Sequence, residues 1–129
     1  MLKIPLGGGT PTTLASGQIA PDGIAVDSTA VYWIEEVASS IVQKVPLRDG
    51  LPILLVSAQG GGTLGLAVDD TNIYWTSELK FGTVMSAPKG GGDPSTLASG
   101  QIEPLGLAID HANVYWGTSD GNVMQLAKP

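Results

Sequence analysis

Side chains that could do chemistry are sparse in this chain of 129 residues. His111 is the only histidine, and cysteine is absent, which excludes disulfides, thiolate nucleophiles and thiolate metal sites. A histidine base needs a nucleophile and an orienting acid held beside it. His111 instead occupies a turn position that Ser28 and Asp70 occupy in equivalent segments. We therefore expect an exposed turn residue there, assign no catalytic residue and expect the chain not to be an enzyme.

Three aspartates recur at one spacing and form the second group with chemical potential. Asp27, Asp69 and Asp110 are separated by 42 and 41 residues, and a ring of carboxylates can bind calcium. However, an aspartate found at the same strand end in every segment is more simply a turn former whose carboxylate accepts backbone N–H groups. We assign these residues a structural role, and we assign neither a metal site nor a cofactor.

Glycine runs at 7–9, 60–62 and 90–92 suggest phosphate cradles at first sight. A phosphate-binding loop needs a Lys-Ser/Thr pair after its glycines and then a helix. Lys89 precedes its glycines, and a strand pattern follows them. The runs at 7–9 and 90–92 therefore predict hairpin turns, whereas the run at 60–62 lies in a connection between two repeats.

Composition and charge narrow the class of protein. Eighteen glycines and nine prolines favour a turn-rich all-β chain. Twelve acidic residues against six basic ones give a net charge of −6, which disfavours partners such as nucleic acid and anionic membranes. No signal-peptide pattern follows Met1, and the longest apolar run, 51–56, is broken by Pro52. We expect a soluble chain and assign no compartment.

An internal repeat dominates the sequence. Every tyrosine and tryptophan belongs to a Tyr-Trp dipeptide, and the dipeptides are 42 and 41 residues apart. The heptapeptide Thr-Leu-Ala-Ser-Gly-Gln-Ile occurs at 13–19 and again at 96–102. We treat the chain as one domain with repeat units at about 5–45, 46–87 and 88–129. The repeated positions to which we assign structural roles are Gly23, Gly65 and Gly106, Asp27, Asp69 and Asp110, and the pairs Tyr32-Trp33, Tyr74-Trp75 and Tyr115-Trp116.

Four short strands are predicted in each unit, which is the pattern of a β-propeller blade. Successive residues of a strand point to opposite faces, so each Tyr-Trp pair presents one ring to each face of its sheet. The glycine before the first strand suits a bulge or a close approach. The predicted first strands are 23–27, 65–69 and 106–110, the second 31–34, 73–76 and 114–117, the third 41–45, 83–87 and 122–126, and the fourth 12–15, 53–57 and 95–98.

The combination of Gly-Ile-Ala-Val-Asp, Tyr-Trp and Val-Pro-Leu with a glycine turn resembles the YWTD-type repeat of six-bladed propellers. The resemblance covers essentially the whole chain and implies six blades, of which this sequence encodes three, that is, half a propeller. The fourth position of the motif departs from the family, because Glu35, Ser77 and Thr118 stand where aspartate is expected. The family is often secreted or periplasmic. The presence of three blades instead of six suggests an excised or engineered fragment.

Three blades alone would leave two apolar blade faces uncovered, and such faces usually mark an interface. We expect the chain itself to be the partner, with a C2 homodimer closing a six-bladed ring. Strand 12–15 would be swapped onto the last blade of the partner, which lacks a fourth strand. Residues 1–6 and 123–128 both match the third-strand position, so one of these segments must be displaced.

The expected function is a non-enzymatic, self-assembling scaffold or binding module. The alternatives are a propeller that binds a small ligand or glycan and, third, a metal-dependent enzyme of the lactonase or lyase type. Loops that enter the innermost strands border the channel mouth, where pockets form. Asp22, Leu64 and Leu105, the residues just before the repeated glycines, are therefore the candidate ligand-binding residues.

Overall fold

The computed structural model describes residues 1–36, 40–57, 62–77 and 81–129. These residues form thirteen β-strands and no helix, so the described residues contain no helix that could span a membrane. All strand pairs are antiparallel, and within each sheet every strand pairs with its neighbours in sequence. The fold is all-β, as the composition predicts.

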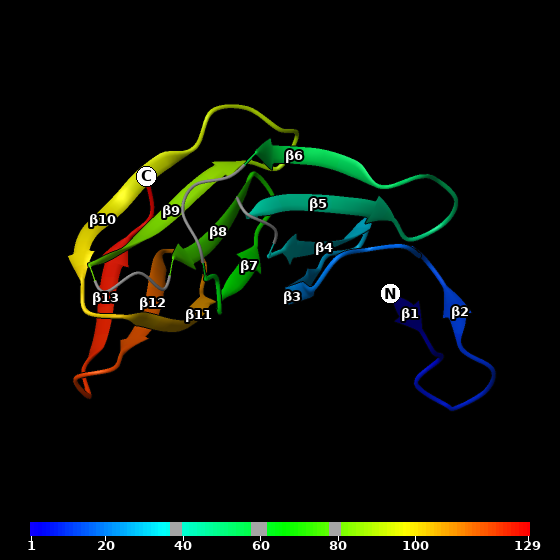
Figure 1. The fold of residues 1–129 in the computed structure, drawn as a ribbon, viewed down its shortest axis with the longest axis horizontal. Coiled ribbons are helices and arrows are strands. Elements are labelled where there is room, and N and C mark those ends of the chain that lie inside the picture. Colours follow the sequence, from blue (N-terminus) through cyan, green and yellow to red (C-terminus); the bar gives the residue numbers. More distant parts are fainter. Residues whose placement is uncertain (37–39, 58–61, 78–80) are drawn as a thin grey trace.

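The strands form four sheets (Figure 1). The N-terminal hairpin consists of β1 (Leu2–Lys3) and β2 (Thr12–Thr13). The first blade consists of β3 (Pro21–Val26), β4 (Ala30–Glu35), β5 (Ile41–Pro46) and β6 (Ile53–Ser57). The middle blade consists of β7 (Leu66–Val68), β8 (Asn72–Ser77), β9 (Gly82–Pro88) and β10 (Ser95–Gln101). The last blade has only β11 (Pro104–Ile109), β12 (Asn113–Thr118) and β13 (Val123–Ala127).

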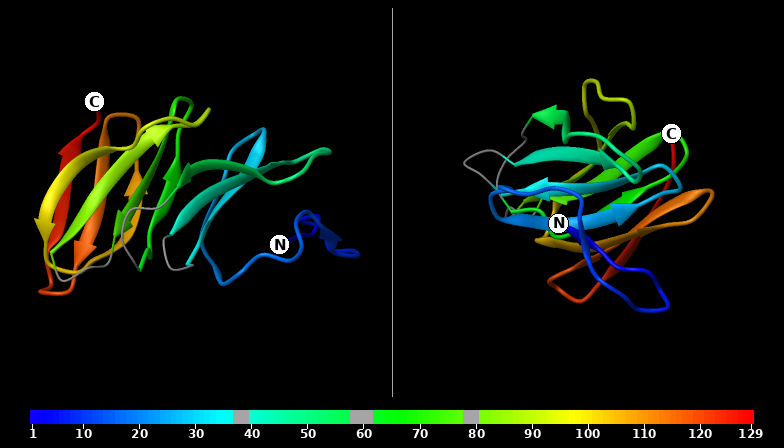
Figure 2. Two further views of the ribbon diagram at one scale, coloured as in Figure 1. Left: turned by 45° about the horizontal axis from the view of Figure 1, so that its top comes forward. Right: turned by 90° about the vertical axis from the view of Figure 1, so that its right-hand side faces the viewer.

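The sheets lie side by side in sequence order, with the hairpin at one end and the last blade at the other (Figures 1 and 2). The Tyr-Trp pairs join neighbouring sheets, as predicted from strand alternation. Tyr32 of the first blade and Trp75 of the middle blade share one buried cluster, and Tyr74 and Trp116 share the next. Trp33 points to the other side of its sheet, where it packs against Ala15 of the hairpin connection.

The strands differ from the predicted ones mainly at their ends, and β10 continues three residues past the predicted end at residue 98. β3 and β11 begin two residues early and continue through Gly23 and Gly106, where the register shifts as in a bulge. β2 covers only two residues of the predicted strand 12–15. The repeat division at 5–45, 46–87 and 88–129 stays a division of the sequence, because each sheet begins at a first strand instead.

The connections between blades contain residues in the left-handed backbone region. Ala20, Gly62 and Glu103 occupy equivalent positions and have φ values of 44°, 63° and 43°. Only glycine adopts this conformation without steric cost. The backbone at this one position is therefore left-handed in all three repeats, although two of the residues carry a side chain.

Candidate functional site

The repeated aspartates form a clamp at the turn between the first two strands of each blade. Asp27 Oδ1 accepts hydrogen bonds from the backbone nitrogens of Thr29 and Ala30 at 2.6 and 2.9 Å. The Tyr32 hydroxyl donates to Asp27 Oδ2 at 2.9 Å, and burial together with this bond raises the pKa of Tyr32 to about 12. The middle and last blades repeat the arrangement. The aspartates thus accept backbone N–H groups of the turn, and the sequence did not predict the tyrosine partner.

A lysine of the following blade extends the clamp in two cases. Lys89 Nζ lies 2.9 Å from Asp27 Oδ2, and Lys128 Nζ lies 2.7 Å from Asp69 Oδ2. Burial raises the pKa of both carboxyl groups, but the hydrogen bonds from lysine and from the turn outweigh burial and hold each pKa well below its usual range. Each pair therefore joins the turn after the first strand of one blade to the residue directly after the third strand of the next blade.

Asp110 has the same turn geometry without a lysine among the described residues. Its carboxylate accepts from the backbone nitrogen of Ala112 at 2.7 Å and from the Tyr115 hydroxyl at 2.8 Å. These bonds hold the pKa of Asp110 at about 2. Asp110 is exposed, whereas Asp27 and Asp69 are half-buried. The position of Lys89 and Lys128 is therefore unfilled at the end of the last blade.

The repeated glycines show how closely the blades approach. A Cβ atom on Gly65 would lie 2.6 Å from the backbone nitrogen of Leu107 in the next blade. On Gly23 it would lie 3.4 Å from Leu66 Cβ, also in the next blade. On Gly106, the third member of the set, it would meet nothing within 4 Å. A Cβ atom would thus clash only at Gly65, Gly23 lies at ordinary contact distance from the next blade, and the same space is open beside Gly106.

Two apolar surfaces flank the array of blades, and we name them by position. The first-blade face carries Ile24 and Val26, which are 65% and 62% exposed. The last-blade face carries Ala108, Tyr115 and Val123, where Tyr115 is half-buried and Val123 is 82% exposed. The tyrosines of the other two blades are buried. At both faces, residues are exposed more than their equivalents in the other blades.

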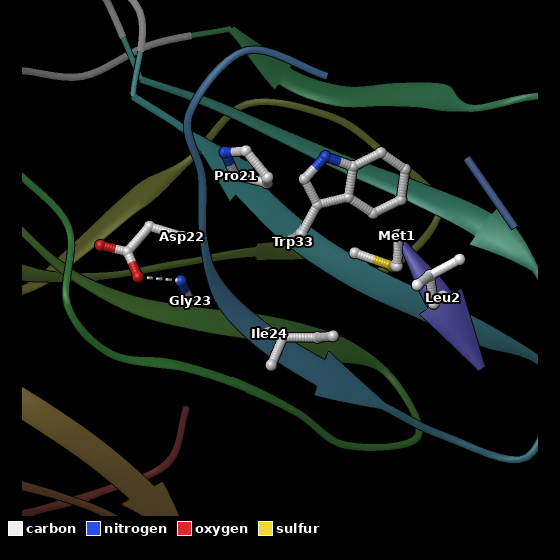
Figure 3. A pocket seen from close by; sticks show the side chains of 7 residues that line it. All are labelled: Met1, Leu2, Pro21, Asp22, Gly23, Ile24 and Trp33. Atoms are coloured by element: carbon white, nitrogen blue, oxygen red, sulfur yellow. Dashed lines mark hydrogen bonds between the residues drawn. The ribbon is translucent and has the colours of Figure 1, made fainter. Parts of the chain in front are cut away.

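The three candidate ligand-binding residues occupy equivalent positions in their blades. Asp22 and Leu64 are exposed and Leu105 is half-buried. Asp22 lines a pocket together with residues of β1, β3 and β4, and its carboxylate accepts a hydrogen bond from the Gly23 nitrogen at 2.8 Å (Figure 3). Figure 3 shows that carboxylate pointing away from the ring of Trp33 on the other side of the pocket. The role of the three residues as a ligand site stays a prediction.

The remaining polar candidates have ordinary surroundings. His111 is exposed in the turn before β12. The described residues contain no group of three or more His, Asp or Glu side chains that could hold a metal ion. Gly8 and Gly91 have φ values of 85° and 93° in the predicted hairpin turns. In the third glycine run, residues 60 and 61 lie outside the described residues.

The sequence did not predict the contacts of the two heptapeptide glutamines. The side-chain oxygen of Gln101, at the end of β10, accepts a hydrogen bond from Trp116 Nε1 at 3.0 Å. Gln18 holds the equivalent position, and both glutamines donate to a backbone oxygen two residues earlier at 2.9 Å. The identical heptapeptides at 13–19 and 96–102 contain these glutamines, so the repeat itself was the available signal.

Comparison with solved structures places the fold among β-propellers. The structure matches a chain in the crystal structure of a nidogen/laminin complex with a TM-score of 0.85 and 21% identity, over 98% of this chain and 51% of that chain. It matches the WD40 domain of Toxoplasma gondii coronin with a TM-score of 0.63 and 16% identity, over 88% and 34%. It matches the computationally designed Ika4 protein with a TM-score of 0.55 and 13% identity, over 91% and 96%.

No model of a known protein family matches the sequence, and no curated protein does. The chain spans about half the length of the nidogen/laminin chain that it matches. The described sheets are therefore blades of a β-propeller, and the predicted fold class is confirmed.

Proposed function

We propose that this chain is a non-enzymatic, YWTD-type propeller scaffold that pairs with a second copy of itself to close a six-bladed ring. The observation that carries the proposal is the pair of faces left open at the two ends of the array. The blade faces between these ends are covered by a neighbouring sheet through a repeated set of contacts. One open face carries the residues that form one side of these contacts, and the other open face carries the residues that form the opposite side.

The first-blade face has the residues that a preceding blade normally covers. Ile24 is equivalent to Leu66, and Leu66 is only 8% exposed because the first blade packs against it. Leu107, the third equivalent residue, packs in the cluster between the middle and last blades. A full blade placed before β3 would bury Ile24 and Val26 in the same way.

The last-blade face has the residues that a following blade normally covers. Tyr115 is equivalent to Tyr32 and Tyr74, which are both 1% exposed. Gly106 is equivalent to Gly23 and Gly65, whose neighbours are Leu66 and Leu107. In a closed ring, Ile24 of the second copy would occupy the open space beside Gly106.

A twofold dimer covers both faces with no further component. The first-blade face of each copy meets the last-blade face of the other, so both junctions are the same. The chain matches about half of a solved propeller chain, which supports two copies per ring. A pair of junctions of this kind buries upwards of about 2,000 Å² in obligate dimers.

A charge on the first-blade face tests the proposal. Ile24→Asp places a carboxylate where the second copy would bury it without a partner, so we expect the dissociation constant to rise at least about 100-fold. Phe81→Asp is the matched control, because Phe81 is 70% exposed in the middle blade, which carries neither open face. Sedimentation velocity with circular dichroism on both variants gives the result. Equal self-association of the two variants would overturn the proposal.

A further inference from the structure

The N-terminal hairpin occupies the place of the third and fourth strands of a blade. Its pairing sets Lys3 opposite Thr12. The first blade sets Lys44 opposite Ile53, and the middle blade sets Ser86 opposite Ser95. These three pairs occupy the same positions in successive repeats. The hairpin therefore has the register of the third and fourth strands of a blade.

The hairpin also docks on the first blade as the first blade docks on the middle one. Lys3 Nζ donates to the Leu47 oxygen at 2.9 Å, and Lys44 Nζ donates to the Lys89 oxygen at 3.0 Å. Met1 and Leu14 pack against the cluster that contains Trp33. The site before β3 is therefore built to receive a blade, and β1 holds its third-strand position.

β1 fills that position poorly. Residues 13–19 and 96–102 have the same sequence, yet β10 is a seven-residue strand and β2 a two-residue strand. The difference lies in the strand opposite each heptapeptide. β9 provides seven residues to β10, whereas β1 provides two to β2. Beyond β2, Met1 continues the pairing, because its oxygen accepts from the nitrogens of Leu14 and Ala15 and its amino group donates to the Ala15 oxygen. Among the described residues, 16–18 have no third strand beside them that could satisfy their backbone groups as β9 does for β10.

β13 carries the sequence that the heptapeptide requires. In the middle blade, Met85, Val84 and Gly82 lie opposite Thr96, Ala98 and Gln101. The same Gly-x-Val-Met pattern recurs at residues 121–124, which lead into and begin β13. Within the described residues the outer edge of β13 has no strand beside it. The chain thus holds two heptapeptides and two Gly-x-Val-Met segments, but only one of the two possible pairings.

One side-chain oxygen without a hydrogen-bond donor in the described part of the chain marks the missing pairing. Gln101, held at the end of β10, accepts from Trp116 Nε1 at 3.0 Å. The equivalent Gln18 has a buried Oε1 with no hydrogen-bond partner among the described residues. Trp33 Nε1, its expected donor, instead reaches Glu35 Oε1 at 3.4 Å. A buried acceptor without a donor costs stability, which pairing of residues 13–18 with a complete third strand would recover.

We infer that β1 is a placeholder, and that β13 of a second copy displaces it and pairs with residues 12–18. This inference rests on the proposed dimer and identifies the segment that is exchanged. β13 is anchored to β12 by five residue pairs, whereas β1 is held to β2 by two residue pairs and by the hydrogen bonds of Met1 with Leu14 and Ala15. β1 is therefore the segment that leaves. Competition between β1 and β13 then sets the affinity of the two copies.

Paired cysteines in the full-length chain test the exchange, because the chain has no cysteine of its own. Thr12→Cys combined with Gln125→Cys places thiols opposite each other only between copies, in the register that Ser86 and Ser95 show. Thr12→Cys combined with Lys3→Cys is the matched variant, and its thiols face each other within one chain. Opposed residues of antiparallel strands lie within disulfide range. Thr12→Cys alone measures accidental cross-linking.

We expect mild oxidation to convert the first variant into a covalent dimer of about 26 kDa, twice the 13.2 kDa of one chain. Oxidation of the second variant locks β1 in place and should weaken dimerisation at least about tenfold, with recovery on reduction. The inference is overturned if the locked variant dimerises as tightly as its reduced form, or if the first variant dimerises without cross-linking above the single-cysteine control. Monomers under all conditions would instead overturn the proposed dimer together with the exchange.

Discussion

Alanine at two equivalent glycines separates the contacts within a chain from those between chains. Gly65→Ala alters the junction between the middle and last blades, and Gly106→Ala alters only the open last-blade face. A Cβ atom on Gly65 would lie 2.6 and 2.7 Å from the nitrogen and Cβ of Leu107, whereas on Gly106 it would meet nothing within 4 Å. Neither glycine has a positive φ, so alanine fits the backbone at both.

The size of each effect follows from these distances. Ordinary contacts of a Cβ atom begin near 3.4 Å, so the Gly65 variant must push the middle and last blades apart by roughly 0.7 Å, and overpacking of this kind costs about 1–3 kcal/mol. In the proposed ring Gly106 occurs at both junctions, so the dimer loses about 2–6 kcal/mol. This loss raises the dissociation constant about 30-fold to 10⁴-fold. Gly23, whose Cβ would lie 3.4 Å from Leu66, represents the looser end of this range.

We expect each variant to change the result of one assay and leave the other unchanged. Urea unfolding is measured at a protein concentration below the dissociation constant of the dimer. The free energy of unfolding should fall for Gly65→Ala and should change by less than about 0.5 kcal/mol for Gly106→Ala. Sedimentation equilibrium should show weakened dimers for Gly106→Ala. If Gly106→Ala dimerised as tightly as the unmodified chain, the assignment of its open space to a second copy would be refuted.

Three further predictions concern the fold and its ion pairs. Circular dichroism should show an all-β spectrum, and helix above about a tenth of the residues would contradict the blades. Trp75→Ala should cost about 3–5 kcal/mol per protomer by cavity formation and His111→Ala less than about 0.5 kcal/mol, so similar urea midpoints would contradict their assigned burial. Because the pKa of Asp27 is lower in the folded than in the unfolded chain, its stabilising effect is present above about pH 4 and is lost as the pH falls further. Lys89→Met should lower stability by about 1 kcal/mol at pH 7 and flatten this acid dependence, measured by urea midpoints from pH 7 to 2; an unchanged pH profile would show that the pair contributes nothing.

The sequence predicted the blades because their positions follow local rules. Alternation along a strand placed Tyr32 and Trp33 on opposite faces, and the structure puts them in different clusters. The role of Asp27 as a turn former followed from its place at a strand end, since its partners Thr29 and Ala30 are two and three residues away. Local patterns of this kind can be read without knowing the neighbouring sheet.

The remaining features depend on segments far apart in the sequence. Lys89 and Asp27 are 62 residues apart in the sequence. The repeat does not predict their ion pair, because the unit before has leucine at the position of Lys89. Strand length was misjudged for the same reason. Residues 12–15 have the sequence of a fourth strand, but their length as a strand is set by β1, which is short. The candidate ligand residues belong to this category too, because a mouth of a channel exists only once all blades are in place.

The mass of the unmodified chain in solution tests the central claim most directly. Multi-angle light scattering over about 1 to 100 µM should give about 26 kDa at the upper end, twice the 13.2 kDa of the chain, with dissociation on dilution. Thermal unfolding should then depend on protein concentration over the same range. A mass of 13.2 kDa at every concentration, from a sample with an all-β spectrum, would contradict the closed ring, and so would the mass of a trimer.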